Sequence, residues 1–357
     1  MTERASEPSP EFPEHRRRPR YSGKNPRRFE DKYKELSPEK YPELVEHVRQ
    51  RGMTPAGQHV PILVDEVLAA LSPRPGERGV DATLGFGGHA QHFLERLAPG
   101  GQLLALDVDP LEMPKTEARL RKLGHDERAL IVQRTNFGGL RAALHEIGWS
   151  DGADFVFVDL GVSSMQIDDT ARGFTFKTDG PLDMRMNPGR GLSATQWLER
   201  ASLEQLAIAL NDDADEPHAL RIARALVARR KDGSGALRTT RELAQAVRDS
   251  LPHHIDEDEA LLSVRRVFQA VRIEVNDEFG ALDALLRQLP ECLCSGGRAA
   301  LLSFHSGEDR RVKKAFQQGV RDGTYSVVAD EVIRASPAEQ RANPRSAPAK
   351  LRWARRG

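Results

Sequence analysis

Residues 78–107 read RGVDATLGFGGHAQHFLERLAPGGQLLALD, and this stretch decides the fold. Its pattern predicts a short strand over 78–83, a glycine-rich loop, a helix over 89–97 and a second strand over 102–107. Glycines directly after a strand let the backbone approach a ligand closely, and they direct the next helix N-terminus towards it. The sequence therefore predicts a β-α-β unit with a ligand-binding loop at the carboxyl end of its first strand.

The same alternation continues downstream. Residues 129–133 and 154–160 are apolar runs that predict a third and a fourth strand, with helices expected over 111–123 and 138–147. Nearly continuous apolar runs indicate strands that are buried on both faces, as in a parallel sheet covered by helices. We therefore predict an α/β fold with a doubly wound, Rossmann-like sheet.

The alternation stops after the fourth strand. Residues 165–195 are rich in Gly and Pro and are expected to form a loop, and strand character resumes only at 298–304, with a helix expected over 307–317. The segments between show helical patterns, over 202–210, 217–230, 239–250 and 259–289. The sequence thus predicts a helical domain inserted between strands 4 and 5.

These patterns divide the chain into segments. We predict an α/β domain in two parts, 56–168 and 267–335, interrupted by a helical insertion over 169–266. The flanking segments 1–55 and 336–357 contain many charged and few large apolar residues, so we expect an N-terminal extension and a basic C-terminal tail without fixed structure. Such tails either only solubilise the chain or neutralise the phosphates of a nucleic acid.

Composition limits the possible functions. The 357 residues include 53 Lys and Arg and 53 Asp and Glu, so no bulk positive charge indicates a nucleic-acid partner. The only cysteines, Cys292 and Cys294, form neither a zinc site nor a disulfide framework by their spacing, and no cluster of carboxylates or histidines predicts a metal. No apolar run approaches the about 20 residues of a membrane span. We expect a cytoplasmic protein without a membrane partner.

Candidate ligand contacts follow the first three strands. The spacing Gly85-x-Gly87-x-x-Ala90 matches the dinucleotide fingerprint, although plain tight turns also produce it. Asp107 ends the second strand, where a carboxylate either accepts the hydroxyls of a ribose or caps the following helix. Phe137 follows the third strand, where its ring either lies against an adenine or packs in the core.

Polar residues also follow strands 4 and 5. Asp159 ends the apolar fourth strand and is followed by Ser163 and Ser164. A buried carboxylate is unfavourable without partners, so this cluster indicates a reaction site rather than packing. The fifth strand is followed by Ser303-Phe304-His305-Ser306, where His305 is either a catalytic residue or a structural histidine.

The loop over 173–186 reads GFTFKTDGPLDMRM and combines aromatic with cationic side chains. Such a combination suits the stacking of an unpaired base beside its phosphate, but an ordinary loop covering the end of the sheet gives the same composition. The candidate substrate contacts are Phe174, Phe176, Lys177 and Arg185.

Two other classes of protein share some of these features. A nicotinamide oxidoreductase has the glycine loop and the acidic residue after the second strand, but it does not account for the long helical insertion. A noncatalytic nucleotide-binding protein does not need polar clusters after strands 4 and 5. The residues therefore favour a nucleotide-cofactor α/β enzyme, and among such enzymes a methyltransferase.

At these positions the chain resembles a known family, the bacterial 16S ribosomal RNA cytosine-N4 methyltransferases of the RsmH (MraW) type. DLGVSS, GPLDMRM and FQAVRI are the most specific of the matching motifs, and all of them occur in family order. The matching stretches are HVPILVDE at 59–66, 81–89, LALDVDP at 104–110, DLGVSSMQID at 159–168, RGFTFKTDGPLDMRM at 172–186, RIARA at 221–225, TTRELA at 239–244, FQAVRIEVN at 268–276 and SFHSGEDR at 303–310.

The resemblance implies a class I S-adenosylmethionine methyltransferase whose inserted helical domain recognises the substrate. It implies methylation of the N4 amine of a cytosine in 16S ribosomal RNA, near the decoding site of an assembled small subunit. A homodimer is compatible with the sequence, which leaves the oligomeric state open. By position, the cofactor contacts implied are Gly87, Gly88, His89, Asp107, Phe137, Asp159 and Gln166. The catalytic candidates, as acceptors of the N4 proton, are Asp159, Ser163, Ser164 and His305.

The chain also departs from the family pattern. Leu262 and Ser263 stand where the family usually has His-Pro, and residues 212–217 replace an aromatic-containing segment. The first 55 residues are expected to have no family counterpart. Methylation at carbon 5 is disfavoured, because it requires a Cys nucleophile at the active-site end of a strand, and Cys292 and Cys294 precede the fifth strand.

Overall fold

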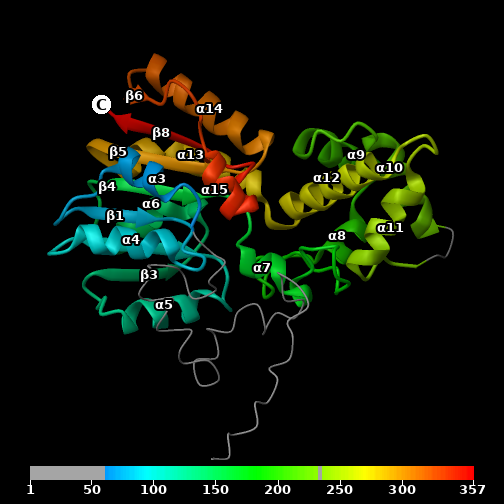
Figure 1. The fold of residues 1–357 in the computed structure, drawn as a ribbon, viewed down its shortest axis with the longest axis horizontal. Coiled ribbons are helices and arrows are strands. Elements are labelled where there is room, and N and C mark those ends of the chain that lie inside the picture. Colours follow the sequence, from blue (N-terminus) through cyan, green and yellow to red (C-terminus); the bar gives the residue numbers. More distant parts are fainter. Residues whose placement is uncertain (1–60, 232–234) are drawn as a thin grey trace, which may run out of the picture.

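The computed structural model describes residues 61–231 and 235–357. Its centre is an eight-stranded sheet with the order β3-β2-β1-β4-β5-β8-β6, in which β7 also pairs with β8 (Figure 1). The strands are β1 (Arg78–Asp81), β2 (Gln102–Asp107), β3 (Leu130–Arg134), β4 (Ala153–Asp159), β5 (Leu293–Ser303), β6 (Tyr325–Val328), β7 (Ile333–Arg334) and β8 (Lys350–Arg356). Among strands β1 to β5, every pair of neighbouring strands is parallel. The predicted α/β, Rossmann-like fold is confirmed.

Helices cover both faces of the sheet, because successive strand residues point to opposite sides. Leu104 and Val156 belong to the apolar core beneath α6 (Leu140–Glu146), α13 (Glu278–Gln288) and α14 (Ser306–Arg321). Their neighbours Leu103 and Phe155 belong to the core on the other face. The helices of that face are α3 (Val64–Leu71), α4 (Gly88–Leu97) and α5 (Met113–Lys122). The apolar strands thus pack against a layer of helices on each face of the sheet.

Of the helices between β4 and β5, those over 194–276 enclose a further apolar core and form a separate body in Figure 1. They are α8 (Ala194–Arg200), α9 (Leu203–Ile208), α10 (Ala219–Lys231), α11 (Thr240–Ser250) and α12 (Glu257–Asn276), with a π-helical turn over Ala209–Asp213. Helix α8 lies partly within the stretch for which a loop is expected. Its start at Ser193 has a capping box with Gln196, a local signal that the Gly- and Pro-rich surroundings mask.

Helix α12 joins the helical body to the sheet body. It is continuous across the predicted domain boundary at 266/267, so that boundary is wrong. The predicted helix over 259–289 is instead two helices, because Asp277 has a left-handed backbone conformation with φ 50° that ends α12 and starts α13. The junction of α12 and α13 brings the inserted helices back to the carboxyl edge of the sheet.

The expectation of a C-terminal tail without fixed structure over 336–357 is also wrong. Residues Pro337–Ala342 form α15, and β8 lies inside the sheet between β5 and β6, antiparallel to both. Leu351 and Ala354 are fully buried, one on each face. The arginines of β8 obscure its apolar residues when the segment is judged by composition. The basic part of the N-terminal extension lies outside the described residues. Within the described part of the chain, no helix is long and apolar enough to cross a membrane.

Candidate active site

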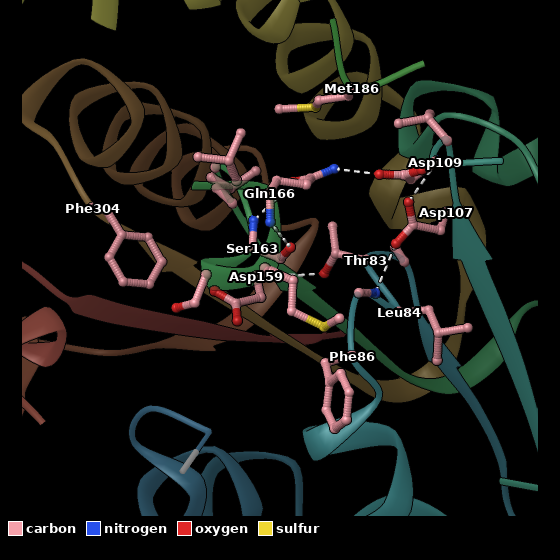
Figure 2. A pocket seen from close by; sticks show the side chains of 18 of the residues that line it. Thr83, Leu84, Phe86, Asp107, Asp109, Asp159, Ser163, Gln166, Met186 and Phe304 are labelled. Carbon is pink, nitrogen blue, oxygen red and sulfur yellow. Dashed lines mark hydrogen bonds between the residues drawn. The ribbon is translucent and has the colours of Figure 1, made fainter. Parts of the chain in front are cut away.

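A cavity of about 470 Å³ opens at the carboxyl ends of the central strands. The strand order reverses between β1 and β4, and open α/β sheets bind their ligands at such a reversal. The glycine loop after β1 and the turn after β4 contribute to the walls (Figure 2). The α12–α13 junction contributes a third wall. A fourth wall comes from residues near the C-terminus, which sequence patterns placed in a tail.

The glycine loop is shaped for close approach. Gly87 has φ 75°, and a Cβ there would lie 2.8 Å from Cγ2 of Thr116. A Cβ on Gly88 would lie 2.6 Å from Cγ of Pro61. The loop is also anchored from α5, since the Thr116 hydroxyl donates a 2.7 Å hydrogen bond to the Gly85 carbonyl. Both predicted glycines line the cavity without space for a Cβ, and Gly87 also has a left-handed conformation that favours glycine.

Asp107 lies at the end of β2 and faces the cavity, as the sequence predicts for a ribose contact. Its carboxylate accepts hydrogen bonds from the backbone N–H groups of Gly85, at 2.7 Å, and Asp109, at 2.8 Å. Burial raises the pKa of Asp107, and these two hydrogen bonds act in the opposite direction. Because each carboxylate oxygen accepts more than one hydrogen bond, the side chain keeps acceptor capacity for a ligand.

Asp159, at the end of β4, is a strongly perturbed carboxyl group of the cavity. Burial, with the nearby charges of Asp81 and Glu308, raises the pKa of Asp159 to about 8. Its Oδ2 lies 3.9 Å from Nδ1 of His89, whose own pKa burial lowers to about 4. Its Oδ1 is buried and has no hydrogen-bond partner among the described residues. An unpaired buried carboxylate oxygen at a cavity wall indicates a place for a ligand donor.

Ser163 and Gln166 start the short helix α7 (Ser164–Asp168) with a capping box. The Ser163 Oγ accepts from the Gln166 N–H at 3.3 Å, and the Ser163 N–H donates to Gln166 Oε1 at 2.9 Å. Gln166 Nε2 in turn donates to Oδ2 of Asp109 at 2.8 Å (Figure 2). The predicted site residues Ser163, Ser164 and Gln166 therefore all line the cavity, with Ser163 and Gln166 held by local bonds.

A buried ion pair beneath the cavity is not among the sequence predictions. Arg172 Nη1 donates to Asp109 Oδ2 at 2.8 Å, and Arg172 Nη2 donates to the carbonyls of Arg185 and Met186 at 3.1 and 2.8 Å. The sequence signals were available, since Asp109 lies two residues after Asp107 and Arg172 begins a family motif. What they do not reveal is that the two side chains meet.

Phe137 and His305 have different relations to the cavity. Phe137 follows β3 and lines the cavity beside Asn136, as expected for a residue that contacts an adenine. His305 precedes α14, and its Nε2 lies 3.1 Å from Oε1 of Glu308. It is Glu308, with Phe304, that lines the cavity, while His305 packs beside the ring of Phe279. Burial alone would raise the pKa of Glu308, but His305 and Arg272 lower it below its usual range.

None of the four predicted substrate contacts is among the residues that line the cavity. Phe174 and Phe176 pack against the helical core, with the ring of Phe176 5.0 Å from that of Phe268. Arg185 forms a bidentate ion pair with Asp183, and Lys177 is exposed. The aromatic residues of this loop thus join it to the helical body, and their role towards a substrate stays a prediction.

Two further groups of residues line the cavity, although the sequence patterns did not identify these residues as candidates. Arg272 and Asn276 lie one turn apart at the end of α12, a spacing that places them on one helix face. Asn276 Nδ2 donates to the Met184 carbonyl and its Oδ1 accepts from the Met186 N–H, which ties the 184–186 loop to α12. The C-terminal group is Asn343, Pro344, Arg345 and Pro348.

The sequence model of the MraW methylase family matches residues 56–357, which include the glycine loop, the turn after β4 and the C-terminal wall. The chain belongs to the MraW methylase family. The family resemblance predicted from the motifs is confirmed. The family model also extends through the last residue of the chain, in agreement with the place of β8 in the sheet.

Relatives match nearly the whole chain. A protein of Alkaliphilus metalliredigens named ribosomal RNA small subunit methyltransferase H 2 is 48% identical over 341 residues, which cover 95% of this chain and 97% of that protein. A protein of Lachnoclostridium phytofermentans named ribosomal RNA small subunit methyltransferase H 1 is 46% identical over 344 residues, with 96% and 93% covered. The family model begins at residue 56, in agreement with the expectation that the first 55 residues have no counterpart in the family. These two relatives nevertheless align with part of residues 1–55, since no more than 5% of this chain is uncovered.

A solved structure described as an S-adenosylmethionine-dependent O-methyltransferase from Thermotoga maritima covers 82% of this chain and 64% of that chain. Its TM-score is 0.37 and its sequence identity 11%. The Rossmann-like assignment of this chain rests on its own sheet order and on its family.

Proposed function

We propose that the protein transfers a methyl group from S-adenosylmethionine to the N4 amine of a cytosine in 16S ribosomal RNA, near the decoding site of the small subunit. Membership of the MraW methylase family and the names of the two relatives support a ribosomal RNA substrate. The N4 amine, the decoding site and an assembled subunit as substrate extend the family resemblance of the motifs. An RNA substrate of this kind also implies that the protein acts in the cytoplasm.

The lining of the cavity fits a cofactor with a ribose, an adenine and a positive charge. Asp107 and Phe137 both line the cavity, and we assign the Asp107 carboxylate to the ribose hydroxyls and the Phe137 ring to the adenine. Carboxylates predominate over cationic groups around the cavity, including Asp81, Asp159 and Glu308. A cationic ligand favours the ionised form of Asp81 and Asp159, whose pKa values burial raises. The residues present therefore fit S-adenosylmethionine.

The proposed reaction requires an acceptor for a proton of the target amine. The N4 lone pair of cytosine is delocalised into the ring, so an acceptor that draws an N4 proton turns the lone pair towards the methyl group. When bound, S-adenosylmethionine supplies an electrophilic methyl group on a sulfonium. The chain needs only to orient the amine and to accept its proton.

We assign the acceptor to the carboxylate of Asp159. This assignment rests on one observation, that the side chain lines the cavity and is 32% exposed, while its Oδ1 has no hydrogen-bond partner among the described residues. Ser163 Oγ already accepts the Gln166 N–H, so we assign Ser163 to holding the 159–164 turn in place. Ser164 lines the cavity beside them and stays a candidate for orienting the base. His305 pairs with Glu308, and we assign it to positioning that carboxylate.

The cysteines do not suit methylation at carbon 5. Leu293 pairs in register with Ala153 at the beginning of β4, so Cys292 and Cys294 lie at the edge of the sheet opposite to Asp159. Burial raises the pKa of the Cys292 thiol to about 12, which disfavours the thiolate that a nucleophile requires. A nitrogen target is in better agreement with these side chains than a carbon target.

The test is mass spectrometry of nucleosides from small subunits of a strain lacking this gene. The subunits are incubated with purified protein and labelled S-adenosylmethionine, and with the variant Asp107→Ala as control. We expect labelled N4-methylated cytidine with the unaltered protein and none with the variant. A label on another nucleoside, or none although the cofactor binds, would refute the proposed substrate.

A further inference from the structure

The C-terminal segment forms a wall of the cavity and presents a cationic side chain there. After α15, residues Pro344–Ser346 form a 3-10 turn that leads towards β8. Four residues around this turn line the cavity, namely Asn343, Pro344, Arg345 and Pro348. Arg345 is the cationic member of this wall, and the family-based assignments of cofactor and catalytic residues do not include it.

The backbone that carries Arg345 is held from several sides. Ser346 and Ala349 are fully buried, and the Ala349 N–H donates to the Ser346 carbonyl at 3.0 Å. Upstream, Glu339 Oε1 accepts the Leu63 N–H at 2.8 Å. Downstream, β8 lies within the sheet. A backbone fixed in this way gives its side chains a defined origin at the cavity rim, as a preorganised binding group requires.

One hydrogen-bond partner orients the guanidinium of Arg345, and its other nitrogens have no partner among the described residues. Its Nη2 donates to Oδ1 of Asp168 at 2.8 Å. Nη2 is its only nitrogen with a partner within residues 61–231 and 235–357, although a guanidinium has five N–H donors. The side chain is 38% exposed, against 13% for Asp168. By contrast, Arg272, which also lines the cavity, donates through two nitrogens to Glu278 and is largely buried.

Asp168 connects this cation to the proposed reaction centre. It is the last residue of α7, and Ser163 caps the start of the same helix. The five residue steps from Ser163 to Asp168 span about 7.5 Å along a helix. The guanidinium therefore lies one short helix away from the turn that carries Asp159. A nucleotide has the same two-ended character, with an uncharged base at one end and an anionic phosphate at the other.

We propose that Arg345 binds a phosphate of the RNA strand that carries the target cytosine, and that Asp168 orients the guanidinium for this contact. Arginine suits the task, because its planar fork matches two phosphate oxygens. The other charged groups around the cavity are mainly carboxylates, which repel a phosphate and leave Arg345 as its attachment point. The inference rests on the proposed function in that it takes RNA as the substrate.

The test compares Arg345→Gln with Arg341→Gln. Arg341 lies in α15 of the same segment and is exposed, but it does not line the cavity, so its variant removes the same charge elsewhere. Methyl transfer to small subunits and filter binding of the subunits, with S-adenosylhomocysteine present, are measured over a range of salt concentrations. Cofactor affinity is measured separately by calorimetry.

We expect Arg345→Gln to weaken subunit binding and to raise KM by about tenfold, as for the loss of a charge-assisted hydrogen bond. The dependence of log affinity on log salt should become shallower by about one unit. Cofactor affinity should stay unchanged, and Arg341→Gln should behave like the unaltered protein. Arg345→Lys, which keeps the charge and loses the fork, should lie in between and guards against a folding defect in the glutamine variant.

Three results would overturn the proposal. Unchanged subunit binding in both Arg345 variants would show that the side chain only bonds Asp168. An equal loss with Arg341→Gln would indicate a diffuse charge effect. Weaker cofactor binding without weaker RNA binding would place the cofactor carboxylate, not a phosphate, on Arg345. If the unaltered protein binds subunits but methylates another nucleoside, the proposed function fails while the phosphate contact can still be measured.

Discussion

Arg172 and Asp109 form a buried ion pair, with Nη1 2.8 Å from Oδ2 and side chains only 8% and 2% exposed. The same guanidinium donates to the carbonyls of Arg185 and Met186, and Asp109 also accepts from Gln166. One side chain therefore links the loop after β2 with the loop that leads to the inserted helices. The cofactor side and the helical side of the cavity are held at a fixed separation by this contact.

Removing Arg172 should destabilise the protein strongly. Arg172→Ala leaves the Asp109 carboxylate buried without its cation, which typically costs about 3–5 kcal/mol. The matched control is Arg248→Ala, because Arg248 pairs with Glu257 at the surface and such pairs contribute about 1 kcal/mol or less. Urea unfolding followed by circular dichroism measures both. Equal losses would show that burial does not strengthen the Arg172 contact.

The stability of the cofactor-free protein should depend on pH through Asp159. Its pKa is about 8 in the folded protein against an ordinary value of 3.8, so the folded state retains a proton between these values that the unfolded state has lost. Stability therefore falls as pH rises from about 4 to about 8. Asp159→Asn stays neutral throughout and should lose fewer degrees of Tm over this range. Parallel Tm profiles for the two proteins would contradict the raised pKa.

Gly87 should not tolerate a side chain. Gly87→Ala adds a Cβ that would lie 2.8 Å from Cγ2 of Thr116, in addition to the strain of a positive φ. Gly100→Ala is the control, because Gly100 has φ 82° but no atom within 4 Å of the added Cβ. We expect both variants to lose about 1 kcal/mol of stability from the backbone conformation. Only Gly87→Ala should also weaken S-adenosylhomocysteine binding in calorimetry, and similar binding in both would remove the steric argument.

Variants of Ser163 and Ser193 separate the effect of a lost helix cap on stability from an effect on the reaction. Each caps a helix through the same capping box, α7 with Gln166 and α8 with Gln196. Either change to Ala should cost about 1 kcal/mol of stability. Ser163→Ala should in addition lower kcat more than cofactor affinity, because the turn carrying Asp159 loses its anchor. A parallel loss of turnover and cofactor affinity would assign Ser163 to the cofactor instead.

The C-terminal strand should contribute to the core of the protein. Leu351→Ala removes a fully buried side chain from β8 and should destabilise the protein by about 2–5 kcal/mol. Val327→Ala in β6 is the control, since Val327 is 46% exposed and surface changes usually stay within about 0.5 kcal/mol. Denaturant unfolding distinguishes the two. A small effect at Leu351 would restore the interpretation of residues 336–357 as a loosely attached tail.

Much of the α/β domain could be predicted because its signals are local. The glycines after β1 and the apolar run of β4 act through neighbours a few positions away. The residues placed at strand ends, Asp107 and Asp159 among them, then had to meet at one edge of the sheet, since parallel strands end together. Their place at the cavity therefore follows from the sequence pattern.

The errors occurred where one local signal obscured another or where distance along the chain mattered. Arginines made β8 resemble a solvated tail, although Leu351 and Ala354 are buried between them, one on each face of the sheet. Phe174 and Phe176, whose role towards a substrate stays a prediction, have the composition of a base-stacking loop and also pack against the helical core. Composition describes what a side chain can contact, and only its surroundings decide which contact it makes.

By itself, the sequence determined the parallel sheet, the glycine loop, the interruption after β4 and the family, because periodicity and turn residues act over short distances. The tertiary structure alone decided that Arg172 reaches Asp109, that Asn276 holds the 184–186 loop and that Arg345 faces the cavity beside Asp168. Each of these contacts joins residues far apart in the chain. Such pairs form only when packing of the whole sheet brings their elements together, and no local pattern records them.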